Sequence, residues 1–181
     1  MEQSYTPIRL NLGCGSYKFP DHINVDLYGD VDFRWDLDSF PYPWADNSID
    51  SIRILHVLEH VKDWWQCFTE CARILKPGGE LHIRVPHYYS HSAITYRDHL
   101  TVFSQLSFHG IRGAGHGTST WAMEETNTVP LVMSDYRQVP FKQYNWMAKW
   151  VPWLLSFCAN HLNGFIWEQQ FTFIKVGNDG K

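Results

Sequence analysis

An apolar segment that ends in a glycine turn most constrains how this chain folds. Ile8–Leu12 has the pattern of a buried strand and runs directly into Gly13-Cys14-Gly15. A second apolar segment, Ile23–Leu27, follows within a dozen residues and carries Asp26 near its end. In an open α/β sheet, a glycine turn after one strand and a carboxylate at the tip of the next hold an adenosine-type ligand. Cofactor binding is therefore the first hypothesis.

The stretch between residues 51 and 86 predicts a strand, a helix and another strand. Ser51–Leu55 has the strand pattern, and Asp63 is the predicted N-cap of the helix, with Gln66 three residues later. Lys76-Pro77-Gly78-Gly79 should end that helix, and Glu80–Val85 should form the next strand. One helix face collects the apolar residues Trp64, Phe68, Cys71, Ala72 and Leu75. A βαβ unit of this kind implies a parallel sheet.

Two further segments have strand patterns, and one long region has none. Phe33–Leu37 predicts a short strand, and Phe165–Val176 predicts a long one near the end of the chain. Between them, the glycine-rich segment Gly110–Gly117 resembles a mobile loop.

Composition limits the kinds of partner and the cellular compartment to be expected. The 181 residues suit one domain, and a net charge of −4 without a Lys/Arg cluster disfavours nucleic acid. The four cysteines have neither disulfide-scaffold nor zinc-pair spacing, and Met1–Thr6 has no signal-peptide pattern, so a cytoplasmic protein is expected.

One Trp-rich segment invites comparison with a membrane span. Trp146–Ala159 is interrupted by Lys149 and Pro152, so its apolar run falls short of the ~20 residues that a span needs. The segment could lie on a membrane surface, but packing over the domain's own core is the commoner explanation.

The glycine turn also discriminates between ligands. Tyr17 and Lys18 stand where a dinucleotide fingerprint would carry its third glycine and open a phosphate-binding helix. A nicotinamide dehydrogenase is therefore the disfavoured alternative.

Six blocks of sequence together resemble a known family. In order they are Leu10–Gly15, Ile23–Leu27, Asp36–Asp38, Trp44–Ile52, Leu55–Val61 and Ala72–Leu81. They are similar to the class I S-adenosylmethionine-dependent methyltransferases, and within that class to the type 11 branch. The resemblance covers about residues 8–86.

The resemblance implies an α/β fold with a Rossmann-like, mostly parallel seven-stranded sheet, helices on both faces and an antiparallel last strand. Residues 1–181 would form a single domain, with a cofactor-binding half (8–86), an acceptor and lid region (87–166) and a final strand (167–176). The path from Gly15 to Asp26 is short, so we expect a compact first helix or a neighbouring chain at that place.

The resemblance also assigns residues to S-adenosylmethionine. Gly13, Cys14 and Gly15 would pass under the methionine part, Asp26 would hold the ribose, and Asp36 and Leu37 would frame the adenine. His56 would lie where the transferred methyl group emerges. The full set of expected cofactor residues is Leu12, Gly13, Cys14, Gly15, Asp26, Leu27, Asp36, Leu37 and His56. Many members carry Asp where Asn11 stands, so contacts to the cofactor's amino group would run through water or another residue.

Methyl transfer to an O or N atom of a small-molecule acceptor, by in-line displacement, is the expected reaction. An acceptor hydroxyl needs a base, and His87, His91 and His99 follow the fifth strand at the carboxyl edge of the sheet. Their alternative interpretation is as polar loop residues. The cluster of His87, His91, Asp98 and His99 could also bind a metal, but a metal is not expected because no Glu lies between the histidines.

The glycine-rich loop and the Trp146–Ala159 segment would form the lid and the acceptor wall. Two alternatives stay open: a cofactor-binding partner subunit without catalytic activity, and assembly into a homo-oligomer.

Overall fold

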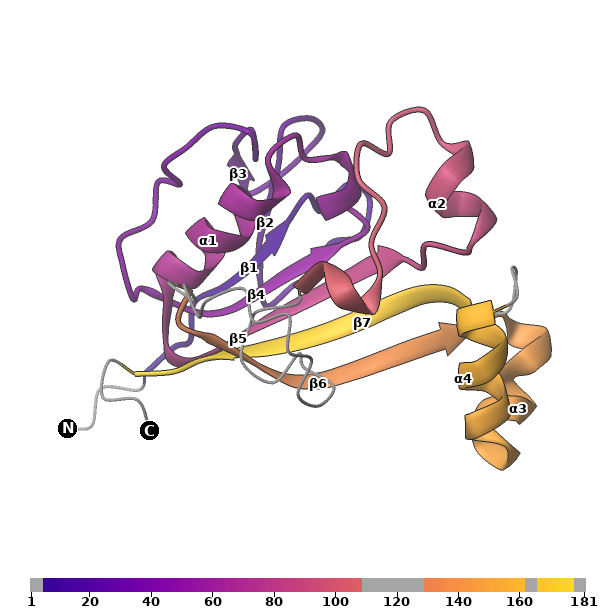
Figure 1. Ribbon diagram of the computed structural model, residues 1–181. Coiled ribbons are helices and arrows are strands. Elements are labelled where there is room, and N and C mark those ends of the chain that lie inside the picture. Colours follow the sequence, from indigo (N-terminus) through magenta and orange to yellow (C-terminus); the bar gives the residue numbers. More distant parts are fainter. Residues whose placement is uncertain (1–4, 109–128, 162–165, 178–181) are drawn as a thin grey trace.

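One seven-stranded sheet organises the computed structural model, which describes residues 5–108, 129–161 and 166–177. The strand order is β3-β2-β1-β4-β5-β7-β6 (Figure 1). The strands are β1 (Arg9–Leu12), β2 (Ile23–Asp26), β3 (Phe33–Arg34), β4 (Ile49–Leu55), β5 (Leu75–Pro86), β6 (Leu131–Pro140) and β7 (Ile166–Lys175). β1 to β5 pair in parallel, whereas β7 runs antiparallel to both β5 and β6. The predicted mostly parallel sheet with an antiparallel last strand is confirmed.

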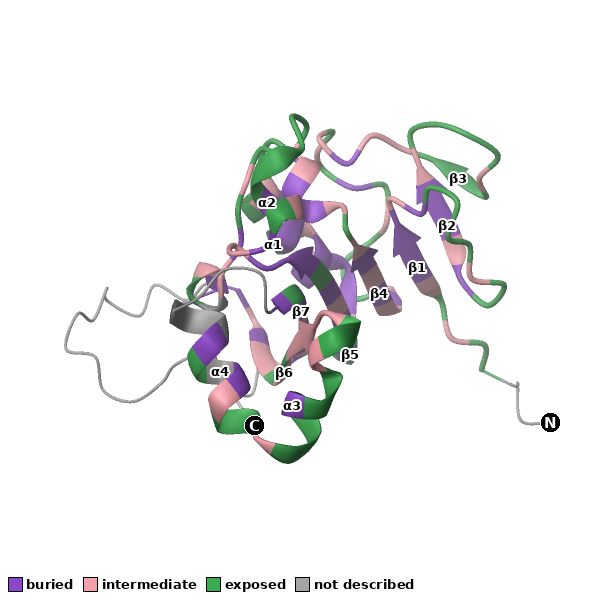
Figure 2. Cartoon of the chain, turned by 90° about the vertical axis from the view of Figure 1, so that its right-hand side faces the viewer, coloured by how far each residue is buried: buried purple, intermediate pink, exposed green. Residues whose placement is uncertain are grey.

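The core lies on one face of the sheet, where apolar residues of adjacent strands share a register. Leu10 and Leu12 of β1 pair with Ile52 and Ile54 of β4, and all four are fully buried (Figure 2). Phe68 of helix α1 (Trp64–Ile74) packs against Phe173 of β7, with ring centroids 5.1 Å apart. Clustered aromatic rings therefore join α1 to the antiparallel half of the sheet.

Helix α1 begins and ends close to where the sequence predicts. The Asp63 carboxylate accepts a hydrogen bond of 2.9 Å from the Gln66 N–H, which caps the helix. The helix ends at Ile74, and Leu75 already pairs with Ile49 of β4. Residues 76–79 then bulge out of the ladder before pairing resumes at Glu80. Because Pro77 and Gly78 cannot continue the helix, the strand starts without a loop.

The connection between β1 and β2 consists of turns, and none of residues 13–22 is helical. The expected compact first helix is thus replaced by a folded loop. Asn11 and Asn24 hold this loop, since the Asn11 amide donates to the Asn24 side chain at 3.0 Å and to the Tyr17 carbonyl at 2.7 Å. The Phe19 ring lies over the Arg53 guanidinium at 4.8 Å. The connection has only ten residues, 13–22, and these contacts hold it in turns, so no length remains for a helix.

The other face of the sheet is polar. Between β1 and β5 the described residues form one α-helix, α1, which covers the apolar face. On the opposite face, Glu80, His82 and Arg84 of β5 alternate with the buried Leu81 and Ile83 and are at least partly exposed. The helical cover of the sheet is therefore lighter than expected, and the polar side chains tolerate that exposure.

The region after β5 contains elements that the sequence did not predict. Helix α2 (His91–Thr95) follows β5, a short 3-10 turn η2 (Gln105–Phe108) packs on the core through Phe108, and β6 forms the outer strand. β6 escapes prediction because its residues do not alternate between buried and exposed as a half-buried strand does. The expected glycine-rich loop Gly110–Gly117 lies outside the described residues.

The Trp-rich segment forms two short helices at the end of β6, called here the α3–α4 hairpin (Figure 1). They are α3 (Asn145–Trp150) and α4 (Pro152–His161). A small apolar cluster of its own, Met147, Leu155, Cys158 and Ile166, holds the hairpin together. The prediction that this segment packs over the domain's main core is therefore wrong, because its buried residues form a separate cluster. Among the described residues, no helix is long and apolar enough to cross a membrane.

Candidate functional site

The glycine turn after β1 is fixed to the neighbouring strand. The backbone N–H groups of Gly13 and Cys14 both donate to the Val25 carbonyl, at 2.8 and 3.0 Å. Gly13 has φ +66°, and a Cβ at this position would lie 2.4 Å from a methyl carbon of Val57. Only glycine fits both the left-handed backbone and this contact.

Asp26 connects the end of β2 to the glycine turn. Its carboxylate accepts hydrogen bonds from the Gly15 N–H at 2.8 Å and from the Tyr28 N–H at 3.2 Å. These bonds fix the carboxylate at the carboxyl edge of the sheet, where a ligand of the glycine turn would lie.

A pocket of about 680 Å³ opens at this edge, within the size range of small-molecule sites. Its apolar wall contains Leu27, Tyr28, Trp35 and Leu37. Its carboxylates are those of Asp26, Asp36, Asp38 and Asp98, and neither Lys nor Arg occurs among the described residues that line it. Such a lining suits a cation with hydroxyl groups and opposes a pyrophosphate.

Six of the nine expected cofactor residues line this pocket: Gly13, Asp26, Leu27, Asp36, Leu37 and His56. The other three, Leu12, Cys14 and Gly15, do not line it. Leu12 and Cys14 are buried beneath the turn, and burial raises the pKa of the Cys14 thiol, with Asp26 adding to the effect. A Cβ on Gly15 would have no neighbour within 4 Å, so open space lies beside that residue. The Asn11 amide is engaged by Tyr17 and Asn24, which leaves it unavailable to a ligand.

His56 follows β4 with φ +56° and is held between two carboxylates. Its Nε2 lies 2.8 Å from the Glu168 carboxylate, and its Nδ1 lies 3.5 Å from that of Glu59. These two partners raise the pKa of His56 to about 9, so the ring is charged at neutral pH. Glu168 comes from β7, and no sequence pattern linked it to residue 56. His56 is therefore not a general base.

A smaller hollow of about 180 Å³ adjoins the pocket and shares His56 and His60 with it. The rings of His60 and His99 meet edge to face here, 4.8 Å apart. Glu59, His60 and His99 each place one side-chain atom, a carboxylate oxygen or a ring nitrogen, within 4.8 Å of those of the other two. Glu59 Oε2 and His99 Nδ1 are buried without a hydrogen-bond partner in the part of the chain that the structure describes. A group that both donates and accepts, such as a hydroxyl, has the hydrogen-bonding capacity that these two atoms lack.

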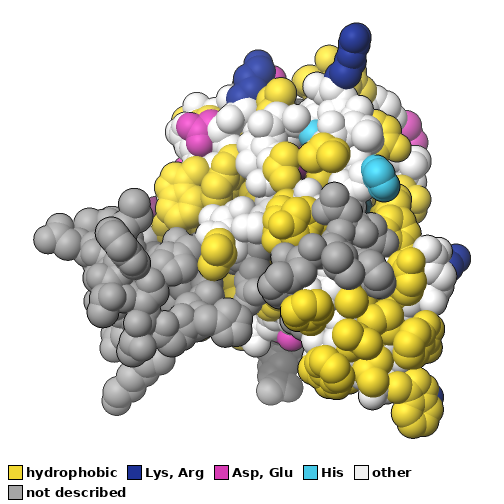
Figure 3. Space-filling model, turned by 45° about the vertical axis from the view of Figure 1, so that its right-hand side comes forward, with side chains coloured by type: hydrophobic (Ala, Val, Ile, Leu, Met, Phe, Trp, Pro, Cys, Tyr) yellow, Lys and Arg dark blue, Asp and Glu magenta, His cyan; other side chains and the backbone are white. Residues whose placement is uncertain are grey.

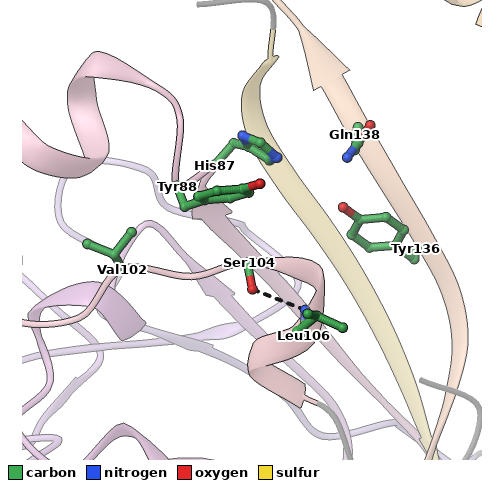
Figure 4. Close-up of a pocket in the computed structure, with 7 residues that line it drawn as sticks. All are labelled: His87, Tyr88, Val102, Ser104, Leu106, Tyr136 and Gln138. Atoms are coloured by element: carbon green, nitrogen blue, oxygen red, sulfur yellow. Dashed lines mark hydrogen bonds between the residues drawn. The ribbon is translucent and has the colours of Figure 1, made fainter. Parts of the chain in front are cut away.

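His87 belongs to a separate hollow of about 530 Å³, which is lined by residues that follow β5 and by residues of β6, with β7 between the two strands (Figure 4). Its side chain lies beside Tyr88 and faces Tyr136 and Gln138 of β6. Burial lowers the pKa of His87 to about 4 and raises that of Tyr136 to about 12, so both groups are neutral at pH 7. His87 would thus be a weak base.

The structure does not bring the three expected catalytic histidines together. His91 is the exposed first residue of α2, His87 lies in the hollow beside β6, and His99 lies in the hollow beside His56. Glu59 and His60 also line the hollow but were not among the expected site residues, although both fall inside the block Leu55–Val61 that carries the resemblance.

Comparisons with known proteins agree with this geometry. Residues 31–83 match the family model described as "Methyltransferase domain". An S-adenosylmethionine-dependent methyltransferase from Archaeoglobus fulgidus is similar in structure, with 14% identity, a TM-score of 0.61, and coverage of 93% of this chain and 86% of that one. A second from Mesorhizobium loti has 15% identity, a TM-score of 0.54, and coverage of 93% and 90%. Geranyl diphosphate methyltransferase in complex with S-adenosylmethionine has 10% identity, a TM-score of 0.59, and coverage of 94% and 78%. No curated protein matches the sequence at a significant level.

The sheet order is the fold of these S-adenosylmethionine-dependent methyltransferases, and residues 31–83 of this chain resemble a methyltransferase domain.

Proposed function

We propose that this enzyme transfers a methyl group from S-adenosylmethionine to an O or N atom of a small-molecule acceptor that enters the hollow beside His56. The proposal rests on one observation: His56 and His60 line both the cofactor pocket and the smaller hollow, so the two spaces are neighbours. An acceptor atom in the hollow would adjoin the cofactor directly. The net charge of −4 supports a small molecule over a nucleic acid.

The cofactor residues carry specific roles in this proposal. Asp26, held by the Gly15 N–H, accepts from the ribose hydroxyls, and Asp36 with Leu37 frames the adenine. Gly13 would contact the methionine part, with Leu12, Cys14 and Gly15 holding the turn in place behind the pocket wall, and Leu27 adds to the apolar wall. Residues 8–86 thus supply the cofactor half, residues 87–166 the acceptor region and residues 167–176 the final strand of one domain.

His99 is the candidate base because it lines the hollow that the acceptor would enter. Its buried Nδ1 lacks a partner among the described groups, and it shares the hollow with the Glu59 carboxylate. When bound, S-adenosylmethionine supplies an activated methyl group, so the protein chiefly aligns the acceptor and excludes water. His99 takes the proton of an acceptor hydroxyl or amine, and Glu59 stabilises the resulting imidazolium. His87 and His91 remain secondary candidates, since the first is a weak base and the second is exposed.

The test is methyl transfer from labelled S-adenosylmethionine into a small-molecule extract and a panel of hydroxyl and amine acceptors. We expect labelled product with the wild-type protein, a loss of about 10²-fold or more in His99→Ala, and little change in His91→Ala. Cofactor binding without transfer to any acceptor would instead support a partner subunit without catalytic activity.

A further inference from the structure

The α3–α4 hairpin exposes large aromatic side chains at the surface. Trp150 and Trp153 are 72% and 71% exposed, and Trp146 is 55% exposed. Hydrophobic side chains gather over α3 and α4 on one face of the molecule (Figure 3). A cluster of exposed tryptophans is rare on a protein that needs no partner at that place.

The hairpin's own packing does not use these three rings. Its cluster consists of Met147, Leu155, Cys158 and Ile166, which lie on the inner side of the two helices. In sequence, α4 is apolar around most of its circumference, a pattern that is typical of a helix covered on all sides. We therefore expect the outer side of the hairpin to contact another surface.

The charge pattern indicates what covers it. Between Asp135 and Glu168 the sequence has no acidic residue, although the chain as a whole has 19 of them and a net charge of −4. The same stretch carries Lys142 just before α3 and Lys149 within it, whereas Arg137 lies on β6 and pairs with Asp135 at 2.7 Å. The Lys149 ammonium lies 5.2 Å from the centroid of the Trp150 ring, so a cation and an interfacial aromatic ring are adjacent. Tryptophan beside basic residues is the composition of segments that lie in the headgroup region of anionic membranes.

A second copy of the chain fits this surface poorly. A two-fold contact would bring Lys142 and Lys149 of one copy against the same residues of the other, and the sequence between Asp135 and Glu168 has no carboxylate to pair with them. Anionic lipid headgroups, in contrast, would neutralise both lysines.

The position of the hairpin connects this surface to the catalytic edge. β6 runs in the same direction as β5, because both are antiparallel to β7. Pro140 at the end of β6 pairs with Ile166, close to where Pro86 at the end of β5 pairs with Glu168, the carboxylate partner of His56. The hairpin therefore projects from the edge of the sheet that carries the cofactor pocket.

We infer that the α3–α4 hairpin binds the surface of an anionic lipid bilayer, with Trp146, Trp150 and Trp153 in the headgroup region and the cofactor-binding edge turned toward the membrane. This inference rests on the surface of the hairpin, and it stands whether or not an acceptor is found. Taken with the proposed function, it favours acceptors that are themselves held at the membrane.

Vesicle sedimentation of the full chain tests the inference. We expect binding to vesicles of phosphatidylcholine with about 30% phosphatidylglycerol, and much weaker binding to pure phosphatidylcholine or at high salt. The Trp150→Ala/Trp153→Ala variant should bind at least tenfold more weakly, and Lys142→Gln/Lys149→Gln should lose about fivefold for each charge removed. Tyr17→Ala is the control, because Tyr17 is 80% exposed in the turn between β1 and β2 and should leave binding unchanged.

S-adenosylhomocysteine binding, measured in parallel, separates this test from the proposed function and checks that each variant is folded. Wild-type protein that binds S-adenosylhomocysteine but not the anionic vesicles would overturn the inference, as would equal vesicle binding by the tryptophan variant. Self-association that disappears in the tryptophan variant, without vesicle binding, would assign the surface to a second copy and would also overturn it.

Discussion

The Asp26 carboxylate and the Gly15 N–H are joined by a hydrogen bond of 2.8 Å that links the end of β2 to the turn after β1. The two residues are eleven positions apart, and no helix lies between them. This bond holds the carboxylate at the rim of the acidic pocket without the helix that usually follows a glycine turn in doubly wound folds. The short connection thus keeps Asp26 beside the glycine turn without a helix between the two strands.

Asp26→Ala should weaken S-adenosylmethionine binding by at least tenfold, because it removes the proposed acceptor of both ribose hydroxyls and the support of the Gly15 N–H. Isothermal calorimetry measures this directly. Asp30→Asn is the matched control, since the Asp30 side chain is fully exposed and pairs with Lys18. Similar losses in both variants would mean that general charge, rather than the Asp26 contact, governs binding.

Gly13→Ala should destabilise the fold by about 2–5 kcal/mol, from the left-handed backbone and the overlap with Val57. Urea unfolding gives the difference. Gly29→Ala separates the two causes, because Gly29 has φ +85° but open space around its missing Cβ, so its cost should be about 1–2 kcal/mol. In the background of Val57→Ala, the cost of Gly13→Ala should fall toward that of Gly29→Ala, and an unchanged cost would refute the clash.

The His56–Glu168 pair predicts a pH dependence of stability. Because the pKa of His56 is raised to about 9 in the folded protein, the pair's contribution is fully present below about pH 6.5 and is lost as the pH rises through about 9. The gap in unfolding free energy between the wild-type protein and Glu168→Gln should therefore narrow over that interval. NMR titration of the His56 ring should show a lower pKa in Glu168→Gln, and an unchanged value would contradict the assignment of Glu168 as its main partner.

Lys175 is a buried cation that caps helix α1. Its ammonium donates to the Leu75 carbonyl at 2.7 Å, the Arg73 carbonyl at 3.1 Å and the Asn47 side chain at 2.8 Å. Lys175→Met would leave these acceptors unsatisfied and should cost about 1–3 kcal/mol in urea unfolding. Lys18→Met, at a half-exposed surface pair, should change stability by less than about 1 kcal/mol. Equal effects would mean that the three bonds of Lys175 contribute nothing.

The cofactor half was largely predictable because its signals are local. The glycine turn, Asp26 and the Asp63 cap each depend on residues close in sequence, and their positions agree with the structure. The short stretch between Gly15 and Asp26 indicated that a full first helix would not fit. The contacts of Asn11 and Phe19 that hold the loop in its place could not be predicted from the sequence. β6 was missed because burial in an outer strand does not follow the period of two.

The three candidate histidines show which contacts a single sequence does not predict. His87, His91 and His99 are close in sequence, yet each lies in a different environment. Glu168, which sets the charge of His56, lies 112 residues away in the chain. Pairings across this distance arise from the order of strands in the sheet, and a single sequence carries no signal for them.

The central claim is that the pocket beside Gly13 and Asp26 binds S-adenosylmethionine. Calorimetric titration of the full chain with S-adenosylmethionine, S-adenosylhomocysteine and NAD tests it most directly. The structure predicts that both sulfur compounds bind at one site per chain and that NAD does not. The described lining of the pocket carries four carboxylates and no Lys or Arg, and its one charged imidazole, His56, is already paired with Glu168 and Glu59. Failure of both sulfur compounds to bind, or tight binding of NAD, would contradict the claim.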